Sequence, residues 1–174
     1  AREGARTVPP RENGGKCDIK NLSKGSRVYF PVYVDGAKLS IGDLHFSQGD
    51  GEITFCGGIE MPGWVDLRVN VIKNGMEKYH IKKNPAFKPS PLLPNYSDYI
   101  VFEGISVNEF SGAQTYLDAN TAYLNACLNA IEFLKTRGFT GEQAFMLLGS
   151  APVQGTVAGI VDVPNSCCTI ALPG

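Results

Sequence analysis

Alternation of hydrophobic and polar residues predicts β-strands in the first half of the chain. In residues 64–73, WVDLRVNVIK, a valine or leucine recurs at every second position, which is the pattern of a strand with one buried face. Asn74 and Gly75 follow directly and favour a tight hairpin turn, so we expect residues 76–81 to return as an antiparallel strand. Residues 27–35 are rich in β-branched and aromatic side chains and predict a further, edge strand.

The second half of the chain predicts a strand, two helices and two final strands. A strand-like run at residues 99–107 is followed by hydrophobic residues at helical spacing, for which Asp118 is the expected N-cap. Thr140 begins a capping box that opens a second, shorter helix. Because helices do not alternate with strands, we expect an α+β fold. Its first half, residues 1–94, is β-rich and sandwich- or barrel-like, and residues 95–174 form a strand–helix–helix–strand–strand unit.

The composition describes an ordinary globular protein. Of the 174 residues, 43% are hydrophobic and 19% are charged, and the mean hydropathy is −0.08, which disfavours both disorder and a membrane span. Sixteen basic and seventeen acidic residues give a net charge of −1, so the chain offers no electrostatic footprint for nucleic acid or anionic lipid. We therefore expect a small neutral ligand, and neither nucleic acid nor a membrane as partner.

Cysteine usage and the first residues predict the cellular compartment. Five cysteines occur without the spacing of a zinc site or of a disulfide framework, which indicates free thiols in a reducing compartment. The chain opens with AREGARTVPPREN, which lacks both an initiator Met and the apolar core of a signal peptide. We expect a cytoplasmic protein, of which this chain starts at an internal position.

The densest cluster of reactive side chains is GDLHFSQGDGE, residues 42–52. Asp43 and His45 are two positions apart, so on an extended chain their side chains point to the same side. Asp50 and Glu52 repeat this spacing after a bend that the neighbouring glycines allow. Acids and an imidazole that face one space can deprotonate a water, protonate a leaving ammonia or hold a metal ion. The segment therefore suits amide hydrolysis.

Two other interpretations of this segment stay open. A short stretch rich in Gly, Asp and Ser is typical of a hairpin or bulge whose acids accept hydrogen bonds from backbone N–H groups. The protein would then be a noncatalytic β-sandwich module or a structural subunit. Alternatively, Asp43, Asp50 and Glu52 form a structural Ca²⁺ site, because hard cations favour carboxylate oxygens.

Five strings along the chain carry a family resemblance: ARTVPPRENGG, CDIKNLSKGS, GAKLSIGDLHFSQGDGE, YLDANTAY and VDVPN. They closely resemble the acetamidase/formamidase family, especially its eukaryotic formamidase-like members, and the resemblance covers essentially the whole chain. It implies a hydrolase that acts on the carbon–nitrogen bond of a small linear amide, with formamide giving formate and ammonia. Family members usually have roughly twice this length. The resemblance therefore implies a C-terminal portion, whose partners are the N-terminal half of the same protein and further copies in a homo-oligomer.

The resemblance also supports a set of site residues. Glu52 is the expected general base, because a partly buried carboxylate can take a proton from water. Asp43 and His45 are expected to orient that water or to hold a divalent metal such as zinc or calcium, and Asp50 is a further catalytic candidate. The substrate-binding candidates are Asn13 and Asp18.

Overall fold

The computed structural model divides the chain into two compact units, which are described separately. The residues it describes are 10–55, 58–81, 83–90, 98–161 and 163–173. The first unit comprises Ala1–Leu44 and Met61–Pro94, and the second comprises His45–Glu60 and Asn95–Gly174. The sequence-based division at residue 94 places residues 45–60 with the first part, whereas they pack with the second unit.

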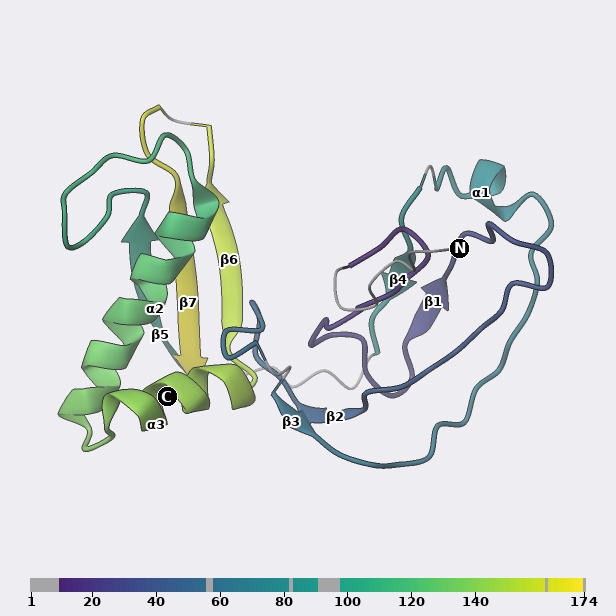
Figure 1. Ribbon diagram of the computed structural model, residues 1–174, viewed down its shortest axis with the longest axis horizontal. Helices are drawn as coiled ribbons and strands as arrows, with labels where there is room; N and C mark the ends of the chain where they lie inside the picture. The colour runs from purple at the N-terminus through teal and green to yellow at the C-terminus, as the bar shows by residue number, and fades with distance from the viewer. Residues whose placement is uncertain (1–9, 56–57, 82, 91–97, 162, 174) are drawn as a thin grey trace, which may run out of the picture. The chain divides into compact units, whose positions relative to one another are not determined.

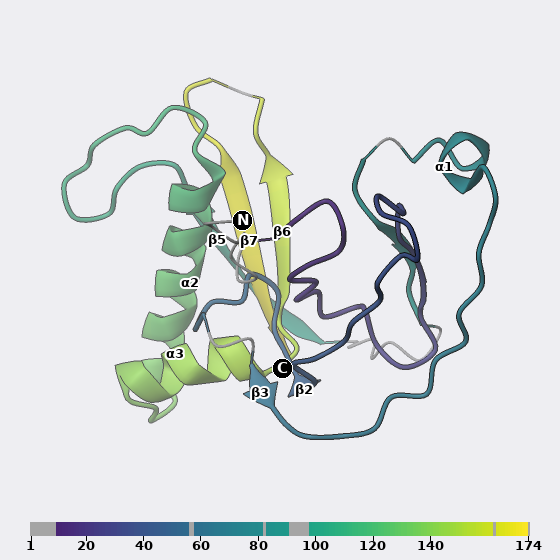
Figure 2. The same ribbon diagram turned by 45° about the vertical axis from the view of Figure 1, so that its right-hand side comes forward.

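The second unit is a three-stranded antiparallel sheet with a long helix on one face (Figures 1 and 2). Its main elements are β5 (Tyr99–Ile105), α2 (Ala119–Thr136), α3 (Gly141–Ser150), β6 (Gln154–Gly159) and β7 (Cys167–Pro173). The strand order is β5-β7-β6; α2 packs on one face of the sheet, and α3 packs against α2 and contributes to the same core. None of the described helices is long and apolar enough to cross a membrane. The expected α+β class is confirmed.

Local sequence signals determine where both long helices begin. The Asp118 carboxylate accepts hydrogen bonds from the Thr121 hydroxyl at 2.7 Å and from the Asn120 N–H at 2.9 Å. These two bonds lower the pKa of Asp118, because they stabilise its charged form. At the start of α3, Thr140 and Gln143 exchange hydrogen bonds between side chain and backbone as a capping box. Both predicted caps are confirmed, because capping depends on residues only two or three positions apart.

The hydrophobic core of the second unit lies between the helices and β7. Every second residue of β7 is buried, including Ile170 and Leu172. Gly104 of β5 lies so close to α2 that a Cβ there would overlap the helix backbone. Small side chains on α2 permit this approach. They are Ala122, Ala126 and Ala130.

The first unit contains only short elements. β1 (Arg27–Tyr29) pairs antiparallel with β4 (Ala86–Lys88), and α1 spans Gly75–Lys78. A second pair, β2 (His45–Ser47) with β3 (Ile59–Glu60), belongs to the second unit. Among the described residues these strands form two-stranded ladders and no sandwich or barrel. The sandwich- or barrel-like arrangement of residues 1–94 therefore stays a prediction.

The expected hairpin at residues 64–81 is wrong. Asn74 does adopt the left-handed conformation, with φ 55°, but α1 follows it in place of a return strand. Residues 61–72 lie in no strand and run as a long coil between β3 and α1 (Figure 1). Side-chain alternation indicates which face of a segment can be buried, whereas a strand also needs a neighbour that binds its backbone groups. No such neighbour exists among the described residues.

Candidate functional site

The middle of the GDLHFSQGDGE segment is bound to the C-terminal end of α3. The Ser47 hydroxyl donates to the backbone carbonyl of Ser150 at 2.7 Å. Two residues later, the Gly49 N–H donates to the carbonyl of Gly149 at 3.2 Å. These carbonyls belong to the last turn of a helix and have no partner within the helix itself. The segment satisfies them, which explains why residues 45–60 pack with the second unit.

Gly49 is required by this contact. A Cβ at Gly49 would lie 2.6 Å from the carbonyl oxygen of Leu148 and 2.8 Å from that of Ala151. Both atoms belong to the backbone, so a rotamer change could not relieve the overlap. The glycine therefore allows the segment to lie directly against the end of α3.

Asp50 is hydrogen-bonded at both its backbone and its carboxylate. Its N–H donates to the carbonyl of Val153 at 3.2 Å, and its carbonyl accepts from the Tyr123 hydroxyl at 2.7 Å. The carboxylate Oδ2 accepts from the Gly155 N–H of β6 at 2.9 Å. This contact is the one expected if the segment is a hairpin or bulge whose acids accept hydrogen bonds from backbone N–H groups. Asp50 holds the segment against β6, and a catalytic role for it stays a prediction.

Tyr123 of α2 supports the site, although the sequence assigned it no role there. A Cβ at Gly155 would lie 2.7 Å from its hydroxyl oxygen, and one at Gly51 would lie 2.7 Å from its ring. Burial raises the pKa of Tyr123, with smaller contributions from Cys127 and Asp50, so the hydroxyl remains a hydrogen-bond donor at neutral pH. No local pattern links these residues, because they are distant in the sequence and meet only in the fold.

His45 in β2 is oriented by Gln48. The two side chains approach to 2.7 Å between Nδ1 and Oε1, and Gln48 is only 7% exposed. Because an amide oxygen only accepts, Nδ1 donates this hydrogen bond, which fixes the orientation of the ring. The sequence does place a glutamine three residues after the histidine, but only the fold shows that the two side chains meet.

Glu52 lies at the bend that follows the anchored residues. Gly51 and Glu52 both have a left-handed backbone, with φ 93° and 48°. The carbonyl of Glu52 accepts from the Phe55 N–H at 2.9 Å and closes a turn. Its side chain is half-buried. A left-handed conformation is uncommon outside glycine, so the surrounding contacts must hold it, and they determine where this carboxylate points.

The other predicted residues lie in the first unit. Asp43 and Asn13 are exposed, and the Asn13 side chain accepts a backbone N–H two residues further on, at 3.1 Å. Asp18 is half-buried and forms an ion pair with Lys16 at 2.5 Å. The expected partners Asp43 and His45 fall in different units, so their joint site stays a prediction.

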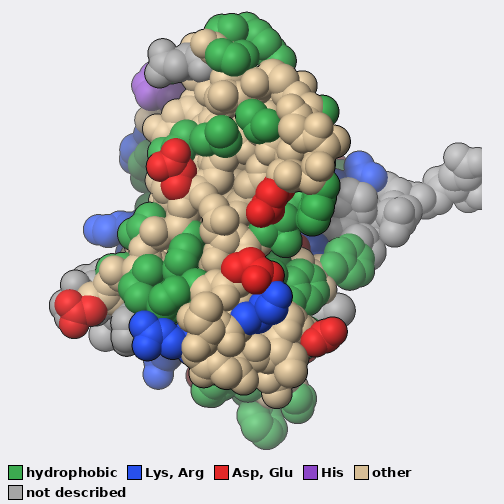
Figure 3. All heavy atoms as spheres, turned by 90° about the vertical axis from the view of Figure 1, so that its left-hand side faces the viewer, with side chains coloured by type: hydrophobic (Ala, Val, Ile, Leu, Met, Phe, Trp, Pro, Cys, Tyr) green, Lys and Arg blue, Asp and Glu red, His purple; other side chains and the backbone are tan. Residues whose placement is uncertain are grey.

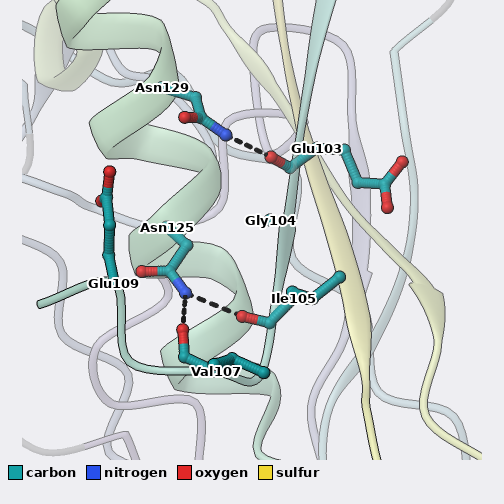
Figure 4. A pocket seen from close by; sticks show the side chains of 7 residues that line it. All are labelled: Glu103, Gly104, Ile105, Val107, Glu109, Asn125 and Asn129. Atoms are coloured by element: carbon teal, nitrogen blue, oxygen red, sulfur yellow. Dashed lines mark hydrogen bonds between the residues drawn. The ribbon is translucent and has the colours of Figure 1, made fainter. Parts of the chain in front are cut away.

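A pocket of about 290 Å³ lies beside β5 and α2 (Figure 4). Asn125 donates to the carbonyls of Ile105 and Val107 at 2.7 and 2.6 Å, and Asn129 donates to the carbonyl of Glu103 at 2.6 Å. Since β5 is an edge strand, these amides bind carbonyl groups that no neighbouring strand reaches. The lining residues are Glu103, Gly104, Ile105, Val107, Glu109, Asn125 and Asn129.

This pocket does not have the chemistry of a hydrolytic site. In Figure 4 the side chain of Glu103 points away from α2, while that of Glu109 points along the helix, so the two acids do not converge. Figure 3 shows the side of the molecule that carries α2, where scattered acidic side chains alternate with hydrophobic patches. None of the predicted site residues lines the pocket. Its two asparagines instead bind backbone carbonyls along the edge of the sheet.

Comparison with known proteins determines the family. A model of the Acetamidase/Formamidase family matches residues 1–174. This chain belongs to that family. It is 65% identical over 173 residues to a formamidase of Methylophilus methylotrophus, in a match that covers 99% of this chain and 42% of that protein. An acetamidase of Mycolicibacterium smegmatis is 58% identical over 158 residues, which are 91% of this chain and 39% of that protein.

A solved structure gives the same result. The gamma lactamase from Delftia acidovorans is 70% identical with a TM-score of 0.94, over 98% of this chain and 41% of that chain. This member of the acetamidase/formamidase family therefore spans about two fifths of the length of the relatives it matches. The resemblance inferred from the sequence strings is confirmed.

Proposed function

We propose that the full-length protein hydrolyses the carbon–nitrogen bond of small linear amides, with formamide as substrate and formate and ammonia as products. The observation that carries this proposal is the 65% identity to a formamidase over 99% of the chain. Relatives named acetamidase and gamma lactamase support the same class of bond. The proposal concerns the full-length protein, because this chain spans 42% of that formamidase.

Glu52 is the proposed general base. Water adds its oxygen to the amide carbonyl carbon, the carbon–nitrogen bond breaks, and the nitrogen leaves as ammonia with one proton of the water. The other proton of the water is released from the carboxylic acid as formate forms. Glu52 takes a proton from the water and returns it to the leaving nitrogen. Two features support this role: Glu52 is half-buried, and it follows directly on a segment anchored to α3 and β6. Anchoring limits the positions that the base can take.

Asp43 and His45 are proposed to orient the water, and Asn13 and Asp18 to bind the substrate amide. The hydrogen bond between Nδ1 and Gln48 fixes the orientation of the His45 ring, and Nε2 is proposed to contact the water. The ion pair with Lys16 balances the charge of Asp18. A neutral amide then meets hydrogen-bonding groups with little net charge, which suits a substrate that carries none.

A divalent metal ion such as zinc or calcium is a further part of the proposal. The arrangement of His45 fits a metal ligand, since histidines that bind metals commonly donate their other ring N–H to an oxygen, as Nδ1 does to Gln48. Asp43 would supply a carboxylate oxygen. When bound, the metal would polarise the amide carbonyl. Elemental analysis should find the metal in the full-length protein and lose it in His45→Ala; equal metal content in both would contradict this role.

Ammonia release from formamide and acetamide tests the proposed activity. We expect the full-length protein to turn over formamide faster than acetamide. Replacement of the base by Glu52→Gln should lower kcat by about 10²-fold or more. The control is Glu132→Gln, which removes an exposed carboxylate on α2 that pairs with Lys135. Absence of ammonia release from both amides would refute the function, and an active Glu52→Gln would refute the role of Glu52.

Three expectations from the sequence complete the proposal. We propose a cytoplasmic location, a homo-oligomeric state and a sandwich- or barrel-like arrangement for the first 94 residues in the full-length protein. Cell fractionation and sedimentation of the native protein test the first two. An experimental structure of the full-length protein tests the third.

A further inference from the structure

The first unit has no hydrophobic core of its own in the part of the chain that the structure describes. Every buried core residue identified there belongs to the second unit. Large hydrophobic side chains of the first unit are instead exposed, from Phe30 at 42% to Trp64 at 99%. Burial of apolar surface is the main favourable contribution to folding, so a unit without it needs a surface to pack against.

Residues 64–72 show this deficit most clearly. Leu67, Val69 and Val71 are 54%, 66% and 82% exposed, although they alternate with polar residues as in a half-buried strand. Among the described residues, no backbone hydrogen bond involves residues 62–71. The segment thus has the side-chain pattern of a strand and unsatisfied backbone groups, which together favour pairing with an additional strand.

We propose that residues 64–72 form a β-strand by pairing with the part of the same full-length polypeptide that lies outside these 174 residues, and that Val65, Leu67, Val69 and Val71 pack against it. The polar residues Asp66, Arg68 and Asn70 then face away from that part. None of residues 64–72 is among the proposed catalytic or substrate-binding residues. The ammonia-release experiment and the experiments below can therefore fail independently.

The lengths of the relatives support this occupant. The matched formamidase, acetamidase and gamma lactamase all extend far beyond the matched region, which is 39–42% of each. A strand partner in the same chain is present at an effective concentration of the order of millimolar, because the chain tethers it. A second copy must associate from free solution. The rest of the same chain therefore pairs with residues 64–72 in preference to a second copy.

Hydrogen–deuterium exchange of the full-length protein tests strand formation without any substitution. We expect amides of residues 64–72 to exchange at least about 100-fold more slowly than an unstructured peptide of that sequence. Exchange at the rate of the unstructured peptide would overturn the proposal.

A photo-crosslinking residue at position 69 of the full-length protein identifies the occupant. With p-benzoylphenylalanine in place of Val69, we expect crosslinks within one chain to peptides outside these 174 residues. Crosslinks to a second copy, or only to residues within the 174, would overturn the proposal.

A matched pair of variants tests the direction of the side chains. Val69→Lys should lower the melting temperature of the full-length protein by several degrees, since it places a charge in the packed face. Asn70→Lys, on the opposite face, should leave it nearly unchanged. Equal melting temperatures for the two variants would overturn the assignment of faces. If Val69→Lys does not fold, the exchange experiment on the unsubstituted protein still decides whether the strand forms.

Discussion

Replacement of Gly49 by alanine should detach the GDLHFSQGDGE segment from α3. The new Cβ would lie 2.6 and 2.8 Å from the carbonyl oxygens of Leu148 and Ala151. Because these oxygens belong to the end of a helix packed in the core, the segment must move instead, by about half an ångström or more. That movement lengthens the hydrogen bonds that Gly49 and Asp50 donate, each now 3.2 Å long.

The expected loss of stability follows from these contacts. Overpacking a well-packed contact costs about 1–3 kcal/mol. Each weakened hydrogen bond costs about 1 kcal/mol. The sum is a decrease of about 3–5 kcal/mol in the free energy of unfolding, or about 6–20 °C in melting temperature for a domain of 150–250 residues. Because Glu52 follows three residues later, amide turnover should also fall.

Gly42→Ala is the matched control for this experiment. It makes the same chemical change in the same motif, but no atom lies within 4 Å of the new Cβ. Calorimetry and ammonia release on the full-length protein should show a normal melting temperature and turnover for Gly42→Ala, and a loss of both for Gly49→Ala. If the two variants have the same melting temperature, the segment is not held by the contact described here.

Three further experiments test the core and the titrating groups. Leu148→Ala, at a fully buried position, should lower the free energy of unfolding in urea by about 2–5 kcal/mol; Leu124→Ala, at a residue 53% exposed, should cost far less, and equal costs would contradict the assigned core. Since burial raises the pKa of Tyr123 above its ordinary 10.0, the stability from its neutral hydroxyl is fully present below pH 10 and is lost as the pH rises through the higher folded-state value. Tyr123→Phe should therefore reduce the fall in melting temperature that occurs as the pH rises above 10. If the fall is the same in Tyr123→Phe, groups other than Tyr123 cause it. Burial also raises the pKa of Cys127 to about 12, so iodoacetamide at pH 8 should label it only after unfolding; rapid labelling of the native protein would contradict its burial.

Much of the second unit could be predicted from the sequence, because its signals are local. Asp118 and Thr140 cap their helices through residues two or three positions away, so the sequence alone located both helix starts. The family could also be inferred from strings of neighbouring residues. These features need no knowledge of what the rest of the chain does.

The failed hairpin at residues 64–81 shows where local signals end. The alternation in residues 64–72 is real, but whether a strand forms depends on a partner, and none is present among the described residues. The left-handed Asn74 was compatible with either a hairpin or the start of α1. A turn residue specifies its own backbone angles and leaves the next element open.

The candidate site, too, could be predicted only in part from the sequence. From the sequence alone, GDLHFSQGDGE could be singled out by its acids, imidazole and glycines. Only the tertiary structure distinguished Asp50, whose carboxylate binds Gly155, from Glu52, a half-buried residue that follows the anchored segment. It also brought Tyr123 to the segment. These contacts join residues far apart in the chain, and a hydrogen bond or an overlap depends on distance in space, which no spacing along the sequence reports.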